Sequence, residues 1–299
     1  MTLLFTSKLL DNDSFIASLF LAPTIILIIV LFFYPISQTL WLSFTKVTKF
    51  EKNPQFIGFD NYIRVFSTYE FYTIIMNSAI WTSIVVAFQF LIGLFTALLL
   101  AQDLKLRSIA RGLIILPWAM PGAIAGYLWK FLLDSTIGPF NWFLISLGLM
   151  REPHSWLGSP STALFSVILS AIWKGFPFST LMYLAAIQSI PKELLDAADV
   201  DGAGFLNKLR FIIIPYIMPI IRITLLLTTI WTFNYFDLIW VMTKGGPRIS
   251  SHIFPTYIYQ VAFEWSEFGT ASVYAFIDFI ILCVFSILYI VQLKKGGIF

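Results

Sequence analysis

The chain has 299 residues, of which 59% are hydrophobic and only 12% are charged. Soluble domains carry roughly 25% charged residues, so this composition excludes an ordinary soluble protein and predicts an all-α membrane protein with several spans. The net charge of +3 is too small to indicate nucleic-acid binding. The single cysteine, Cys283, cannot form a disulfide framework or a thiolate metal site by itself.

Six apolar stretches are long enough to cross a bilayer, which takes about 20 residues. We expect spans at about residues 15–34, 74–102, 112–132, 163–188, 216–242 and 270–293. The third of these contains Pro117, Pro121 and a Gly122–Gly126 pair, which a span tolerates where neighbouring helices approach closely. The whole chain, residues 1–299, is therefore expected to be a single transmembrane domain of six helices.

The distribution of lysine and arginine predicts the orientation of these spans. Basic residues are about twice as dense in the segments that lie on the N-terminal side of the membrane as in the segments on the other side. Cytoplasmic loops carry the excess of positive charge. Both termini are therefore expected inside, together with the loop at 189–215.

That loop is the most polar part of the chain, with four acidic residues between Glu193 and Asp201. Pro191 suits the first turn of a helix, and Glu193 and Asp196 lie where the helix dipole favours acids. Gly202 and Gly204 are expected to end the helix in conformations closed to other residues. By itself this pattern fits a partner-binding helix or a plain solvated connector equally well.

Several motifs resemble the permeases of binding-protein-dependent ABC importers. Within the loop, Asp-Ala-Ala at 196–198, Asp-Gly-Ala at 201–203 and Ile-Pro at 214–215 resemble the family's "EAA" loop. Outside it, the resemblance rests on Gly-Phe-Asp-Asn-Tyr at 58–62, Leu-Pro-Trp-Ala-Met-Pro-Gly at 116–122, Trp-Lys-Gly-Phe-Pro-Phe at 173–178, Phe-Asp at 236–237 and Thr-Lys-Gly-Gly-Pro at 243–247. These look like the carbohydrate-uptake branch, specifically the first permease subunit of the maltose/glycerol-phosphate type. Asp196 for Glu and Ile214 for Leu are the two departures, and both conserve the chemistry.

The resemblance implies a type I importer architecture and a set of partners. These are a second permease subunit forming a heterodimer, two cytoplasmic ATPase subunits, an extracellular solute-binding protein and a carbohydrate substrate. The chain would be a non-catalytic subunit in a prokaryotic cytoplasmic membrane, without a cofactor of its own, because it lacks a phosphate-binding Gly-x4-Gly-Lys motif and ATP and Mg belong to the ATPase. The coupling residues implied are Glu193, Leu194, Asp196, Ala197, Ala198, Asp201, Gly202, Ala203 and Pro215.

Candidates for a substrate path are polar or aromatic residues inside the spans, because sugars bind to aromatic platforms and amides in a preformed cavity. They are Asn77, Trp81, Gln89, Trp129, Trp173, Lys174, Asn234, Tyr235, Asp237 and Asp278. Aromatic residues are abundant throughout this chain, so each is equally explained by packing. Lys174 and Asp278 lie at similar depths, which predicts a structural ion pair rather than a substrate contact.

Two other classes of function remain open. An ion-coupled secondary sugar transporter would also have buried charges in its spans, but it would require coupling groups and internal repeats that the sequence does not display. An intramembrane enzyme would require a nucleophile and base or a metal set, yet His154 and His252 are the only histidines, and both are expected in outer loops. No metal site is expected.

Overall fold

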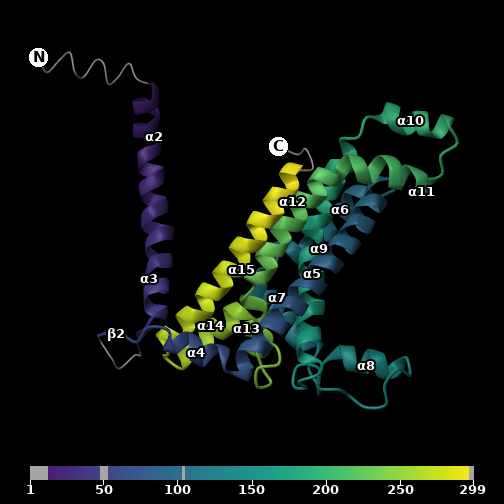
Figure 1. Cartoon of the computed structure of the whole chain (residues 1–299). Helices are drawn as coiled ribbons and strands as arrows, with labels where there is room; N and C mark the ends of the chain where they lie inside the picture. The colour runs from purple at the N-terminus through teal and green to yellow at the C-terminus, as the bar shows by residue number, and fades with distance from the viewer. Residues whose placement is uncertain (1–12, 48–52, 103–104, 296–299) are drawn as a thin grey trace, which may run out of the picture. The chain divides into compact units, whose positions relative to one another are not determined.

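A computed structural model of the chain describes residues 13–47, 53–102 and 105–295 (Figure 1). The terminal residues 1–12 and 296–299, which were expected on the inner side of the membrane, lie outside these ranges. The described residues are almost entirely helical, as the composition predicts. Their strands are β1 (Thr45–Lys46) and β2 (Gln55–Phe56), which form an antiparallel pair with Thr45 opposite Phe56.

Five helical segments of the described chain are long and apolar enough to cross a membrane, and a bent pair of helices makes a sixth if it is counted as one span. The five are Ala17–Ser43, Tyr69–Ala101, Ala163–Gln188, Phe205–Phe233 and Phe268–Lys294. α9 (Ala163–Gln188) has the bounds expected from sequence, and α5 (Tyr69–Ala101) and α15 (Phe268–Lys295) differ from expectation by a few residues.

The first span is longer than the sequence indicated. It runs through α2 (Asp13–Ile28), a π-helical turn η1 (Ile29–Phe33) and α3 (Tyr34–Ser43), so Pro35 does not end it. Pro35 is the second residue of α3, directly after the π turn. A π turn loosens the hydrogen-bond ladder, and the missing N–H of Pro35 is accommodated there.

The third span is broken rather than continuous. α6 (Arg107–Ala119) and α7 (Gly122–Leu132) meet at an angle of 95°. Pro121 lacks an N–H and excludes the helical conformation from the residue before it, so Met120 is extended, with ψ at 133°. Two closely spaced prolines in a span can therefore mark a break, where we expected only a tolerated irregularity.

The fifth span begins earlier and ends earlier than expected. α11 (Phe205–Lys208), η2 (Leu209–Ile213) and α12 (Ile214–Phe233) form one continuous segment, with Pro215 inside it. Asn234, Tyr235 and Phe236 interrupt the helix, and α13 (Asp237–Thr243) is separate. The remaining short helices are α4 (Asp60–Phe66), α8 (Pro139–Ser146), α10 (Lys192–Val200), α14 (Phe254–Tyr259) and the π turn η3 (Gln260–Glu264).

The described residues divide into two compact units. The first holds the described part of residues 1–65 and residues 261–277. Its centre is Asn61 of the Gly-Phe-Asp-Asn-Tyr motif, which is buried and donates to the carbonyls of Ser43 and Thr45 at 2.9 and 2.8 Å. Arg64 donates to the Thr270 hydroxyl at 2.7 Å. Asn61 of the motif therefore ties α4 to the strand β1, and Arg64, two residues after the motif, ties α4 to the start of α15.

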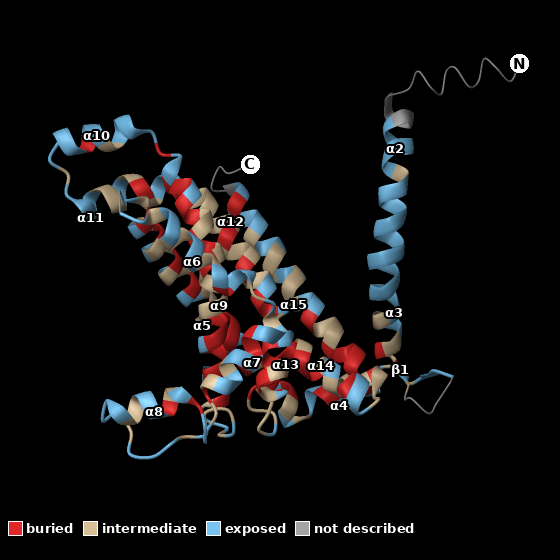
Figure 2. Ribbon diagram, turned by 180° about the vertical axis from the view of Figure 1, so that it is seen from behind, coloured by how far each residue is buried: buried red, intermediate tan, exposed pale blue. Residues whose placement is uncertain are grey.

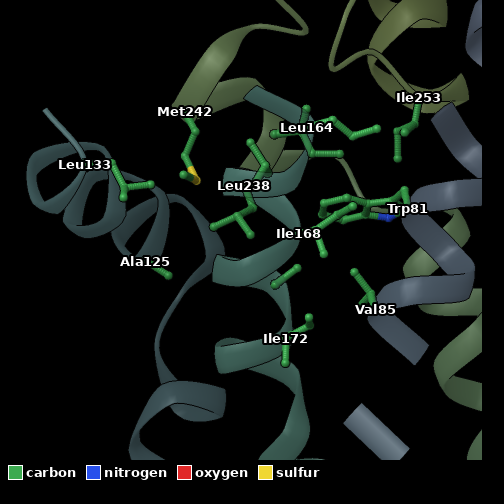
Figure 3. Close-up of a cluster of buried hydrophobic side chains, with 13 residues drawn as sticks. Trp81, Val85, Ala125, Leu133, Leu164, Ile168, Ile172, Leu238, Met242 and Ile253 are labelled. Carbon is green, nitrogen blue, oxygen red and sulfur yellow. The ribbon is translucent and has the colours of Figure 1, made fainter. Parts of the chain in front are cut away.

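The second unit holds residues 66–260 and the described residues beyond 277. In it α5 and α9 pack closely enough that a Cβ at Gly93 would lie 2.6 Å from the Cβ of Ser179. One hydrophobic cluster surrounds Trp81, Ile168 and Leu238 (Figure 3). A second surrounds Leu100, Tyr183 and Ile217, further along the same helices. The stretch of α5 and α9 between the two clusters holds the polar residues described below.

Candidate functional site

α10 is the ordered helix at the centre of the polar loop. It runs from Lys192 to Val200 and stands with α11 at one end of the second unit, opposite α8 (Figure 1). Ala198 is its buried residue, only 8% exposed, whereas Glu193, Leu194 and Asp196 are exposed. Most of α10 is exposed (Figure 2). Ala198 and the half-buried Leu195 seat the helix, and its acidic side faces outward.

The end of α10 is a Schellman motif built on Gly202. The N–H of Ala203 donates to the carbonyl of Ala198 at 2.9 Å, and the N–H of Gly202 donates to that of Asp199 at 3.1 Å. This motif requires a left-handed residue after the helix, and Gly202 has φ of +75°. The expectation for Gly204 is wrong, because its φ is −68°, a value open to any residue.

A salt bridge closes the loop after this turn. Lys208 of α11 donates to the Asp199 carboxylate at 2.7 Å. Asp201 caps the helix, and Pro215 lies beyond the loop, as the second residue of α12. The loop is thus an ordered unit in which α10, the glycine turn at Gly202 and α11 follow one another.

A second polar site lies midway along the spans. It is a cavity of about 90 Å³ between α5, α6, α9 and α12. Of the residues proposed from sequence, it brings together Gln89, Lys174 and Tyr235. Its other lining residues are Trp118, Ala171, Gly175, Phe178, Thr228, Trp231 and Thr232. Aromatic rings, an amide, hydroxyls and one cation therefore converge in a single place.

Three aromatic residues of this cavity were missed in the sequence. Trp118 stacks on Phe178 with ring centroids 5.9 Å apart, and Phe178 meets Trp231 edge to face at 5.0 Å. They come from α6, α9 and α12, so no spacing within one helix groups them. Trp118 and Phe178 belong to the Leu-Pro-Trp and Trp-Lys-Gly-Phe-Pro-Phe motifs, which was the signal that could have found them, whereas Trp231 belongs to neither motif.

The charged residues are paired differently from the sequence prediction. Asp278 is buried, and its Oδ1 has no hydrogen-bond partner among the described residues. The carboxylate whose charge acts on Lys174 is that of Asp237. The expected Lys174–Asp278 ion pair is therefore not formed among the described residues. Asp237 also accepts from the N–H of Leu238 at 3.0 Å.

Other candidates from the sequence serve packing. Asn77 donates to the carbonyls of Ile249, Ser250 and His252 at 3.1–3.2 Å, so it holds the loop between α13 and α14. Trp81 is fully buried and donates to the Thr232 carbonyl at 2.8 Å.

The last three candidates also lie outside the cavity lining. Trp129 and Trp173 contact each other edge to face at 5.8 Å and pack against the first cluster. Asn234 is exposed and donates to its own helix, at the carbonyl of Ile230.

Comparison with known proteins gives these two sites a context. Residues 89–294 match the family model described as "Binding-protein-dependent transport system inner membrane component". The chain belongs to this family. It is therefore the membrane permease of an ABC importer, a multi-pass protein that is not itself the enzyme, and the match does not support an ion-coupled secondary transporter.

Two similar proteins are named as carbohydrate transport permeases. The permease is 32% identical over 95% of its length to a trehalose/maltose transport system permease protein from Thermococcus litoralis, covering 96% of that protein. It is 34% identical over 91% of its length to a sulfoquinovosyl glycerol transport system permease protein from Agrobacterium fabrum, covering 89% of it.

A solved structure shares the fold. A chain of a bacterial ABC transporter that imports the acidic polysaccharide alginate superposes with a TM-score of 0.82 at 23% identity, covering 97% of the permease and 98% of that chain. The six-helix type I importer architecture expected from sequence is thereby supported. Within the described part of the permease, no group of three or more His, Cys, Asp and Glu could hold a metal ion.

Proposed function

We propose that the permease passes a carbohydrate from an extracellular binding protein into the cytoplasm by alternating access, driven by ATPase subunits that engage α10. The single observation that carries this proposal is α10 itself, an ordered helix with an exposed acidic side, seated on Ala198 and ended by Gly202. Asp196, exposed near the middle of α10, would pair with a basic group of the ATPase.

The complete assembly we propose has two ATPase subunits that bind ATP and Mg, one binding protein and a second, homologous permease. The density of lysine and arginine supports an orientation with both termini and α10 in the cytoplasm. The whole chain would act as one transmembrane domain, whose spans rock as rigid bodies between inward-open and outward-open states.

The cavity between α5, α6, α9 and α12 is our candidate for the substrate path. A sugar presents C–H faces that stack on aromatic rings and hydroxyls that pair with amides and charges. Trp118, Phe178 and Trp231 supply the rings, while Gln89 and Thr228 supply polar atoms. The named relatives make an oligosaccharide or a glycosyl glycerol the preferred class.

The test uses the full transporter in proteoliposomes, with trehalose, maltose and glycerol 3-phosphate as substrates for uptake. Gly202→Asp strains the left-handed turn and adds a negative charge beside Asp201, and Ala198→Leu lifts α10 from its seat. Both are expected to uncouple ATP hydrolysis from uptake by tenfold or more, on the order of 1.4 kcal/mol. Gly204→Asp is the matched control, since Gly204 has an ordinary φ and open space around it.

Normal uptake with normal ATPase stimulation in both Gly202→Asp and Ala198→Leu would refute coupling through α10. Uptake that survives ATP depletion but stops with the proton gradient would refute ATP-driven import altogether.

A further inference from the structure

The connection between α9 and α10 is clamped to the start of α6. With its amide oxygen turned toward the guanidinium groups, Gln188, the last residue of α9, accepts from Arg107 Nη2 at 2.7 Å and from Arg111 Nη2 at 2.5 Å. The two arginines are four residues apart on α6, so they share one face of the helix. One acceptor therefore holds two charged donors from another helix.

The same connection is short and held on its other side. Only Ser189, Ile190 and Pro191 separate Gln188 from the first residue of α10. The hydroxyl of Tyr216, on α12, donates to the Ser189 carbonyl at 3.2 Å. Ile190 is buried in the second cluster, and Pro191 has a fixed φ. A displacement of α10 therefore cannot be absorbed by slack before it reaches Gln188.

α6 runs from this clamp to the cavity. Arg107 begins it and Trp118, which lines the cavity, is its penultimate residue, about 16 Å away at 1.5 Å per residue. α6 packs chiefly against α9, whereas α7, beyond the 95° break, packs chiefly against α13. The two halves of the broken span therefore belong to different neighbours, which makes Met120–Pro121 a hinge.

We infer that Gln188 is a positioning residue of the transport cycle. Through Arg107 and Arg111 it makes α6 follow the movement of α10. α6 then turns at Met120–Pro121, and Trp118 moves relative to Tyr235. This inference rests on the proposed role of α10. It assigns to the clamp the step between the movement of α10 and the reshaping of the cavity.

Gln188 is exposed, so its replacement is not expected to unfold the chain. Gln188→Ala removes the acceptor that both guanidinium groups share. Gln188→Glu keeps an oxygen acceptor in place and adds the charge that arginine prefers, so it should preserve the clamp. Gln102→Ala is the matched control, because Gln102 is an exposed glutamine that lines the same groove beneath α10.

The experiment measures the movement of α6 directly in the assembled transporter. Cys283, the only cysteine, is replaced by serine, and spin labels are placed at Ile109 on α6 and Tyr127 on α7, both exposed in this chain. The distance between the labels is measured without nucleotide and with Mg-ATP plus vanadate. Doubly labelled transporter must retain its ATPase activity.

The distance between the two labels is expected to change with nucleotide in the transporter that retains Gln188, and also in Gln188→Glu and Gln102→Ala. In Gln188→Ala the change should shrink to less than about a quarter, and ATP hydrolysed per sugar transported should rise about tenfold or more, a loss of coupling on the scale of 1.4 kcal/mol. The ATPase subunits should still co-purify with this variant, because the outer side of α10 is untouched.

An undiminished distance change in Gln188→Ala would overturn the inference, as would a distance that does not change even in the unmodified clamp. Loss of ATPase co-purification in Gln188→Ala would also overturn it, since the residue would then be merely structural. Failure of the proposed function has a different signature: Gly202→Asp would leave coupling intact, whatever Gln188→Ala does.

Discussion

The side-chain amide of Gln89 lies directly against the backbone of Gly175. Gln89 Nε2 donates to the carbonyl of Ala171 at 3.1 Å, one turn before Gly175 on α9, and a Cβ at Gly175 would collide with that same nitrogen. A residue of α5 and a glycine of the Trp-Lys-Gly-Phe-Pro-Phe motif thus form one wall of the cavity. A glycine is required at position 175 because the side chain of Gln89 approaches its backbone closely, and not because of its backbone angles.

Gly175→Ala is therefore expected to push Gln89 out of its hydrogen bond and into the cavity. Overpacking of this kind costs typically 1–3 kcal/mol, so uptake should fall by about fivefold or more in a transporter that still assembles. Gly112→Ala is the control, because Gly112 of α6 has nothing within 4 Å of its would-be Cβ. Equal uptake by the two alanine variants would contradict this account of the wall.

Asn77→Ala is expected to destabilise the loop between α13 and α14. It would leave the carbonyls of Ile249, Ser250 and His252 without their shared donor, and a buried unsatisfied group costs about 1–3 kcal/mol. The melting temperature of the purified permease should drop, and proteolysis within the loop should accelerate. Asn234→Ala should do neither, because Asn234 is exposed and bonds only within its own turn. Matching melting temperatures would show that Asn77 is not a clamp.

His252, in the loop before α14, should make the permease acid-sensitive. Burial lowers the pKa of His252 to about 4, and a contact with Gln260 opposes this shift only in part. Its ordinary pKa is about 6.5, so between pH 6.5 and 4 the unfolded chain binds a proton that the folded chain refuses. Stability is therefore intact above pH 6.5 and declines as the pH falls to 4, by up to about 3 kcal/mol.

The measurement for His252 is the melting temperature between pH 4 and pH 8. His252→Asn lacks the titrating group and should flatten the acid-side decline, at the expense of lower stability at pH 8, where it disturbs the contact of Nδ1 with Thr256 at 3.1 Å. A decline of equal steepness in His252→Asn would assign the acid sensitivity to other groups.

Lys174 should be coupled to Asp237 and not to Asp278. In a double-mutant cycle, Lys174→Met with Asp237→Asn is expected to show an interaction energy of about 1 kcal/mol, because the opposite charge of the exposed Asp237 acts on the half-buried ammonium of Lys174. The same cycle with Asp278→Asn should be additive within about 0.5 kcal/mol. Thermal stability of the purified permease supplies both energies, and strong coupling to Asp278 would restore the pairing expected from sequence.

The sequence alone was sufficient for the family and for α10. Long uncharged stretches locate spans because a bilayer admits only helices whose backbone groups are satisfied internally. The Asp-Ala-Ala…Asp-Gly-Ala pattern locates a short helix that contains small alanines and ends at a glycine, and both features are local properties of the sequence. Gly202 illustrates the limit of that reasoning: its neighbour Gly204 looks the same in the sequence, and only the backbone angle separates them.

The tertiary structure alone decided where polar side chains in the spans meet. Lys174 and Asp278 share a depth, but depth does not fix which way a helix faces, and the carboxylate whose charge acts on Lys174 is that of Asp237. The cavity likewise joins Trp118, Phe178 and Trp231 from three helices. The physical reason is that helix periodicity and hydropathy are properties of one segment. The break at Pro121, the rotation of each helix and the clamp at Gln188 are set by packing between segments.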